Sequence, residues 1–383
     1  MKLEFHEYRA RKIVNVHRHV DGPWFWGRYS AHPDIGCRSG CEFCYVRGGR
    51  YLGRRDPDSF DTLIQVKVNA VELLQKELAR LQPDVIACGD WQPPAEDRYR
   101  LSRGMLQVVR DFAFPLFIVE RSPRLTRDLD LLTDINQRSW VGVVLSMSSV
   151  DSTLKGAFEP HSPGVKQRLQ AMQTLATAGI LVGAALMPIL PRLGDDERHL
   201  EEVVRATREH GGSFVMAGAL TMEGVQAERT LEAARRLDPA IEADWRNLYR
   251  WRVGGKPEYS PSRAYVAQLG LRVRDLCARH GLLDRMPRYV APGPLAVNRR
   301  IAERLFLKTY DLELEQADDY RIWAFRKAAW TADEWQESLA DLYVARGEAG
   351  LRELPGIGKS LATEIAGWIR DGVVNPLEGQ SGE

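Results

Sequence analysis

Three cysteines lie within one short, glycine-bearing loop, Gly36–Tyr45. Cys37, Cys41 and Cys44 follow the spacing C-x-x-x-C-x-x-C, and clustered thiolates favour zinc or iron–sulfur. Structural zinc usually takes four ligands, commonly as two separated pairs, and the sequence has no second pair at that spacing. Three thiols on a cubane cluster would leave one iron open to a chelating cofactor. The loop therefore predicts a [4Fe–4S] cluster, with zinc or free thiols as the alternatives.

The elements that position this loop are predicted to be repeated β-α units. Short apolar runs alternate with longer amphipathic segments from about Trp24 to Met222, a pattern typical of a parallel sheet. Strands are expected at 84–88, 116–120, 140–147, 180–187 and 213–219, and just before Cys37. Helical spacing is seen at 66–78 and 169–176. The predicted fold class is α/β: six units form a partial (β/α)6 barrel, with reacting groups directly after its strands.

Five regions are expected along the chain. They are an N-terminal extension at 1–23, the partial barrel at 24–224, a helical covering segment and hinge at 225–294, an all-α domain at 295–376 and a disordered tail at 377–383. The hinge is placed at the Pro/Gly-rich stretch Pro287–Pro294.

Composition limits the partners and the compartment. Of 383 residues, 44% are hydrophobic and 27% charged, and the net charge is +1, which excludes a nucleic-acid binder that works by overall basicity. The longest apolar run, Gly179–Leu190, is too short to span a bilayer. No signal peptide is recognisable, and the clustered cysteines do not suggest disulfides. We expect a cytoplasmic monomer that does not contact a membrane.

The cysteine spacing, with the aromatic Phe43 before the last cysteine, resembles the radical S-adenosylmethionine (SAM) superfamily. The resemblance implies that the open iron binds the amino and carboxylate groups of SAM. It also implies that an electron, from a reductase such as flavodoxin or ferredoxin, cleaves SAM to a 5′-deoxyadenosyl radical that takes a hydrogen atom from the substrate.

Flanking segments resemble the spore photoproduct lyase-like proteins, which repair DNA. The match covers about half of the chain, in order, through residues 29–37, 66–70, 90–96, 121–128, 145–151 and 159–163. The resemblance implies that Phe43 packs on adenine, that the Gly89–Asp90 turn offers backbone acceptors to the SAM ammonium group, and that Arg121 pairs with the SAM carboxylate. Ser146 and Ser148 would reach the ribose, with a strand-end hydrogen bond as the alternative for each.

Two further residues receive possible catalytic roles from this resemblance. Cys88 is expected at the carboxyl end of a strand, where lyases of this type carry a thiol that returns a hydrogen atom to the product radical. The alternative is a buried thiol that fills core space. Tyr45 is considered as a radical relay, with packing against the cysteine loop as its alternative.

Near the C-terminus, Leu354–Ala362 is predicted to form a helix-hairpin-helix. Gly356 and Gly358 would let the backbone approach a phosphate closely, and Lys359 adds a positive charge. Such a motif binds DNA without sequence preference and is weakened by salt. The alternative is a hairpin used for packing or protein contact.

The wider segment 298–372, which includes Arg326 and Lys327, is similar to the N-terminal domain of family X DNA polymerases. The resemblance implies binding to DNA. The lysines that perform Schiff-base chemistry in some members are matched here by Ser360 and Glu364, so we expect DNA binding without that activity.

Together these features predict a radical SAM lyase that repairs a pyrimidine photolesion in DNA. One alternative keeps the radical chemistry but acts on RNA, a nucleotide or a protein. Another is a metal-bearing DNA-binding protein without catalytic activity.

Overall fold

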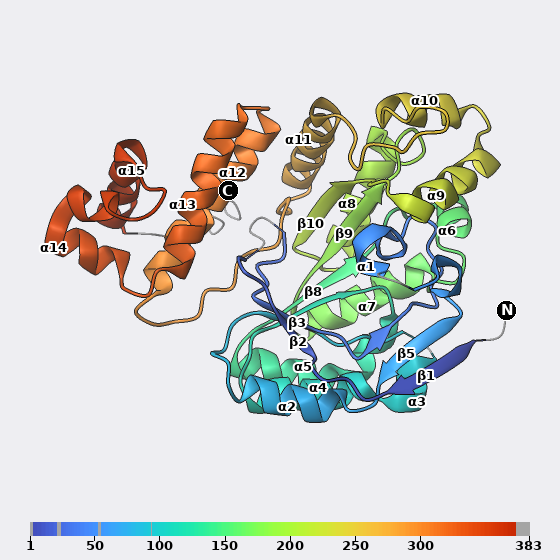
Figure 1. Cartoon of the computed structure of the whole chain (residues 1–383), viewed down its shortest axis with the longest axis horizontal. Coiled ribbons are helices and arrows are strands. Elements are labelled where there is room, and N and C mark those ends of the chain that lie inside the picture. Colours follow the sequence, from blue (N-terminus) through green and yellow to red (C-terminus); the bar gives the residue numbers. More distant parts are fainter. Residues whose placement is uncertain (1–2, 21–23, 53–54, 93, 373–383) are drawn as a thin grey trace. The chain divides into compact units, whose positions relative to one another are not determined.

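The computed structural model describes residues 3–20, 24–52, 55–92 and 94–372, which fall into two compact units (Figure 1). Unit 1 comprises Met1–His17 and Gly27–Arg285, and unit 2 comprises Arg18–Trp26 and Met286–Glu383. The division differs from the expected boundaries in two ways: the helical covering segment belongs to unit 1 as far as Arg285, and a short N-terminal stretch belongs to unit 2. The expected tail at 377–383 lies outside the described residues.

Unit 1 is built on a seven-stranded sheet in the order β10-β9-β8-β7-β6-β3-β2. Its strands are β2 (Val14–Val16), β3 (Tyr29–Ala31), β6 (Ile86–Cys88), β7 (Leu116–Glu120), β8 (Val141–Ser146), β9 (Leu181–Ile189) and β10 (Phe214–Ala219). Only β2 runs antiparallel to its neighbour in this sheet; the other six strands are parallel and adjacent in chain order. This is the strand order that a partial (β/α)6 barrel requires, and the predicted α/β class is confirmed.

A second, three-stranded sheet has the order β1-β5-β4, formed by β1 (Glu4–Tyr8), β5 (Leu63–Lys67) and β4 (Asp34–Ile35). Strand β4 ends directly before Gly36 and the cysteine loop. The helix expected from Val66 begins later, at Ala70, because Leu63–Lys67 alternates between buried and half-buried residues and forms a strand. Val66 belongs to that strand's buried face.

Helices and short turns connect the strands of unit 1, and α2, α4 and α5 lie together on one face of the sheet (Figure 1). They are η1 (Tyr45–Arg47), α1 (Gly49–Leu52), η2 (Pro57–Ser59), α2 (Ala70–Leu78), α3 (Ala95–Tyr99), α4 (Leu101–Asp111), η3 (Pro123–Asp128), α5 (Leu129–Arg138), α6 (Ser152–Phe158), α7 (Val165–Thr177), α8 (Glu197–Glu209), α9 (Gly224–Leu237), α10 (Ile241–Leu248) and α11 (Arg263–Arg279). Among the described residues, no helix has the length and hydropathy needed to cross a membrane.

The two faces of the large sheet differ, and the difference locates the site. Ile86, Ile118 and Val143 point to the helices and are buried in one continuous core with them. Alternation places Val119 on the opposite face, where it is 49% exposed although its strand is central. The face away from the helices is therefore open near the carboxyl end of β7.

Unit 2 is helical, as predicted: α12 (Ala296–Leu314), α13 (Asp319–Glu334), α14 (Leu339–Arg352) and α15 (Lys359–Arg370). Asp318 and Ser338 cap α13 and α14 through their side chains. Trp26 is buried in this unit, where its indole nitrogen donates to the Met286 carbonyl and its ring packs edge-on against Phe306.

A buried carboxylate holds the start of α12 and the end of α13 in unit 2, and its removal tests the packing. Asp333 pairs with Arg288 and, at 3.2 Å, with Arg299, while the Asp333 and Arg288 side chains are only 2% and 3% exposed. Asp333→Asn should lower the free energy of unfolding by about 3 kcal/mol, since it leaves a buried guanidinium unpaired. Urea unfolding measures this, with the surface pair Arg346–Glu353 as the comparison. Equal losses in Asp333→Asn and Glu353→Gln would contradict the assignment.

Candidate functional site

The cysteine loop begins where β4 ends and is held by a side chain from the loop after β6. Gln92 accepts a hydrogen bond from the Arg38 N–H at 2.9 Å and donates to the Gly36 carbonyl at 2.8 Å. Gly36 has φ +106°, and a Cβ there would lie 2.6 Å from the Leu63 carbonyl oxygen, so only glycine fits. Gln92 lies in the segment 90–96 that resembles the lyase-like proteins, but residue spacing alone does not predict its contact with the cysteine loop.

The three thiols are free cysteines inside a largely enclosed loop, and burial raises the pKa of Cys37 and Cys41 to about 12. Within the described residues, no three His, Cys, Asp or Glu side chains form a group suited to one metal ion. Three thiols on one loop could each bind a different iron of a cubane cluster.

Arg121 is the cationic group that the structure brings to this loop. It follows β7 directly, and its guanidinium donates to Cys41 Sγ at 2.9 Å and to Ser146 Oγ at 2.8 Å. The same guanidinium lies 5.4 Å from the ring centre of Phe43. Phe43 and Ser146, two other residues expected around SAM, therefore both contact Arg121, which itself contacts Cys41. A positive charge beside the thiols favours their thiolate form, as iron ligation requires.

A buried ion-pair network supports Arg121 from behind. Glu159 is 1% exposed and lies 3.6 Å from Arg121 and 2.5 Å from the fully buried Arg168. Burial alone would raise the pKa of Glu159, but Arg121, Arg168 and a hydrogen bond from Ser148 hold it at about 2. Arg168 also donates to the Ser146 carbonyl at 2.8 Å, so the network joins the strand end to the cysteine loop. Glu159 lies in the segment 159–163 that resembles the lyase-like proteins, whereas no sequence signal indicated a role for Arg168.

The Ser148 hydroxyl is buried and donates to Glu159 at 2.5 Å, as in the strand-end hydrogen bond considered as its alternative. Its lone pairs can still accept a hydrogen bond, so contact with a ribose stays a prediction. Ser146 remains at the site through its contact with Arg121.

The Gly89–Asp90 turn lies at the carboxyl end of β6, as expected. The Gly89 backbone is hydrogen-bonded by the His32 ring, and the Asp90 carbonyl accepts from Ser102 Oγ at 2.5 Å. Each carbonyl keeps a second lone pair for a ligand. The Asp90 carboxylate accepts from Gln92, so it also helps to hold the cysteine loop. Burial, Glu120 and Asp34 raise the pKa of Asp90.

Cys88 and Tyr45 are not gathered around Arg121. Cys88 shares the helix-facing side of β6 with Ile86 and is 2% exposed within the main core. Its thiol therefore has the position expected of a core-filling residue. Tyr45 opens η1 and is 54% exposed. Nearby, the fully buried Arg47 pairs with Asp61 at 3.0 Å and anchors the segment after the cysteine loop.

In unit 2 the predicted hairpin connects α14 and α15. Gly356 has φ +75°, and a Cβ there would lie 3.6 Å from Lys327 Cβ, so the hairpin lies beside α13. Gly358, Lys359 and Lys327 are exposed. Arg326 instead pairs with Glu313 and stacks 4.9 Å from the Trp323 ring centre. Lys359 of the hairpin and Lys327 of α13 are thus both exposed, while DNA binding by the hairpin stays a prediction.

The fold and site together define a parallel α/β sheet that presents a three-cysteine loop at the carboxyl ends of its strands. The fold is similar to that of spore photoproduct lyase, whose complex with a dinucleoside spore photoproduct superimposes with a TM-score of 0.51 at 17% identity, over 72% of this chain and 79% of that one. A variant of the lyase with bound AdoMet and the same dinucleoside gives 0.50 at 17% identity, over 72% and 78%.

Two sequence relatives match half of the chain or more. An uncharacterized protein of Mycobacterium tuberculosis is 28% identical over 286 residues, which cover 73% of this chain and 82% of the relative. One from Methanocaldococcus jannaschii is 27% identical over 197 residues, covering 51% and 71%. No family model matches the chain.

The pKa of Glu159 generates a pH-dependent prediction. A carboxylate with a lowered folded-state pKa stabilises the fold above its unfolded value near 4.5, and this stabilisation is lost as the pH falls toward about 2. At neutral pH, Glu159→Gln should therefore reduce the free energy of unfolding by about 3 kcal/mol. The difference from wild type should shrink steadily below about pH 4.5.

Chemical unfolding at a series of pH values checks this, with Glu232→Gln as a control because Glu232 pairs with Arg235 at the surface. A deficit of Glu159→Gln that stays constant down to about pH 2 would contradict the ion-pair assignment.

Proposed function

We propose that this protein is a radical SAM enzyme that acts on DNA and repairs a pyrimidine photolesion. The observation that carries the proposal is the meeting of the cysteine loop, Arg121 and Phe43 on the open face of a parallel sheet. The shared fold with spore photoproduct lyase supports it, and so do the sequence motifs that resemble lyase-like proteins. The lyase structures contain AdoMet and a dinucleoside photoproduct, which are the cofactor and substrate class proposed here.

In this proposal Cys37, Cys41 and Cys44 hold a [4Fe–4S] cluster, whose fourth iron is left for SAM. The cluster and SAM together supply a 5′-deoxyadenosyl radical that abstracts a hydrogen atom. Arg121 pairs with the SAM carboxylate, a role that suits its fork of donors, while Phe43 provides an apolar surface for adenine. Ser146 and Glu159 orient Arg121.

The open face around Val119 offers room for a base, half of that side chain being exposed. A base reaches such a face only after leaving the helical stack. Cys88 is not assigned the return of a hydrogen atom, since its thiol points toward the helices. The C-terminal hairpin, with Gly356, Gly358 and Lys359, would add affinity for DNA without sequence preference.

Anaerobic reconstitution tests the cofactor. Wild-type protein should be brown, bind about four irons and cleave SAM to 5′-deoxyadenosine when reduced with dithionite. Replacing any one of the three loop cysteines by Ala should abolish cleavage. Cys277→Ala is the matched control, because Cys277 is a buried thiol far along the chain in α11. A colourless wild-type protein, or loop variants as active as the control, would overturn the proposal.

Product analysis tests the substrate. Reduced enzyme with SAM and ultraviolet-irradiated DNA should remove a pyrimidine photoproduct, and unirradiated DNA should remain unchanged. Cys88→Ala should give the same products as wild type, because a core thiol takes no part in the reaction. If 5′-deoxyadenosine forms only when RNA or a protein is added, and no photoproduct is lost, the alternative substrate classes would be favoured.

A further inference from the structure

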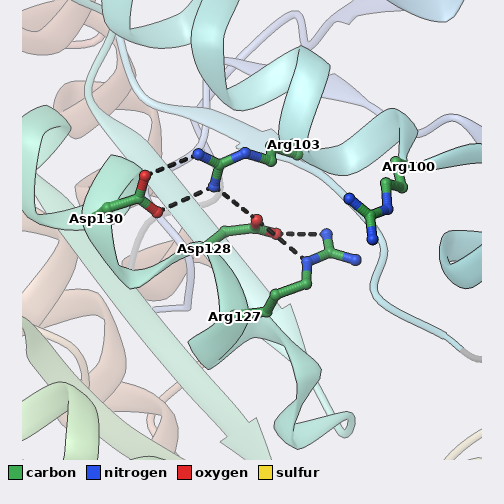
Figure 2. Close-up of a pocket in the computed structure, with 5 residues that line it drawn as sticks. All are labelled: Arg100, Arg103, Arg127, Asp128 and Asp130. Atoms are coloured by element: carbon green, nitrogen blue, oxygen red, sulfur yellow. Dashed lines mark hydrogen bonds and ion pairs between the residues drawn. The ribbon is translucent and has the colours of Figure 1, made fainter.

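A second polar site in unit 1 lies outside the cysteine loop. A cavity of about 480 Å³ is lined by Arg100, Arg103, Arg127, Asp128 and Asp130 (Figure 2). Three guanidinium groups face two carboxylates, and a third carboxylate, the buried Glu96, pairs with Arg127 at 2.5 Å. Arg100 is therefore the cation of the lining that no carboxylate holds among the described residues. Nothing in the proposed handling of the cluster and SAM uses these residues.

The two carboxylates are already occupied by neighbouring donors. Arg103 binds both oxygens of Asp130, at 3.0 and 2.7 Å, and reaches Asp128 at 3.0 Å. The fully buried Asp128 also accepts from Arg127 at 2.6 Å and from the Trp91 indole at 2.7 Å. The groups that remain to bind a ligand in the cavity are therefore hydrogen-bond donors. Such groups suit an anion and not a metal cation.

Arg100 is the cation that is left for a ligand. Its side chain is exposed, and among the described residues it has no hydrogen bond or ion pair; Figure 2 shows its guanidinium on the same side of the cavity as that of Arg127. Its backbone has φ +50°, between α3 and α4, where glycine is the favoured residue. Glycine would adopt this left-handed conformation with less backbone strain. The presence of an arginine here therefore indicates that its side chain has a function.

Arg100 immediately precedes α4, and Arg103 lies in the first turn of that eleven-residue helix. A carboxylate already neutralises the start of α4, because Glu96 accepts a hydrogen bond from the Ser102 N–H at 3.0 Å. The capacity of the cavity to bind an anion therefore rests on its arginine side chains.

A series of hydrogen bonds connects this cavity to the candidate active site. Trp91 donates through its indole to Asp128 and through its backbone to Glu120 at 2.9 Å, and Glu120 in turn accepts from the Arg121 N–H. The segments that line the cavity follow β6 and β7, so they belong to the edge of the sheet where the cysteine loop lies. A polymer with one unit in the active site would pass near this edge.

We propose that this cavity binds a phosphate group through the Arg100 guanidinium and Nη1 of Arg127, since Asp128 and Glu96 hold only the other two nitrogens of Arg127. That the phosphate belongs to a nucleic-acid backbone rests on the proposed function. Phosphate binding itself does not, because a free phosphate or a nucleotide carries the same oxygens.

Arginine labelling with phenylglyoxal, read residue by residue by mass spectrometry on the full-length protein, tests the site directly. Arg100 should react readily, and a single-stranded oligonucleotide without lesions should protect it more strongly than inorganic phosphate at equal phosphate concentration. The exposed Arg11 is the control and should not be protected. Protection by inorganic phosphate alone would keep the anion site and refute the nucleic-acid assignment. No protection by either probe would refute both.

Affinity for the same oligonucleotide, measured by fluorescence anisotropy at several salt concentrations, gives a second readout. Arg100→Gln should weaken binding about three- to tenfold and flatten the salt dependence by roughly 0.7 in log–log slope, while Arg11→Gln should change neither. Arg100→Gly should lose the same affinity without lowering Tm, since glycine relieves the left-handed backbone. A lower Tm with unchanged affinity would show a structural role and overturn the proposal.

These measurements need neither a photolesion nor radical turnover. Failure of the proposed repair reaction would therefore leave the phosphate result standing, and the reverse also holds.

Discussion

The candidate site depends on one buried charge cluster, in which Glu159 lies between Arg168 and Arg121. An isolated carboxylate at this depth would be protonated, and either guanidinium without it would be a costly buried cation. Together they fix the direction of Arg121, which then reaches Cys41 and Ser146. The position of the cysteine loop against the sheet therefore depends on electrostatics behind the site as much as on the loop itself.

The loop is constrained from its other side by amide and carboxylate groups. Gln92 bridges the Gly36 carbonyl and the Arg38 N–H, and Asp90 orients Gln92 in turn. These groups come from the segment after β6, whereas Arg121 follows β7. The loops after two adjacent strands thus each supply a side chain that holds the cysteine loop. This is possible because parallel strands in chain order bring successive loops to the same edge of the sheet. The fold determines the site through this ordering.

Much of this could be predicted from the sequence because the signals are local. Five strands, the helical C-terminal unit and the cysteine loop follow from apolar runs and residue spacing. Partners distant in sequence could not be predicted: neither the contact of Ser148 with Glu159 nor the orientation of Cys88 is visible in spacing alone. Cys88 lies at the expected strand end, yet a three-residue strand gives little alternation from which to infer the face that its thiol occupies. The helix start at Val66 failed for a related reason, since β-branched residues at that spacing also suit a strand.

Charge has to be judged locally in this protein. A net charge of +1 conceals many arginines that form internal ion pairs, as Arg103 and Arg168 do. Arginines without such pairs carry more information about ligands than the total does. Arg100 is distinguished by that criterion and by a left-handed backbone, two features that arise independently. If proteins of this architecture bind a nucleic acid across the carboxyl edge of the sheet, unpaired guanidinium groups at that edge are the groups that can neutralise the phosphates of its backbone.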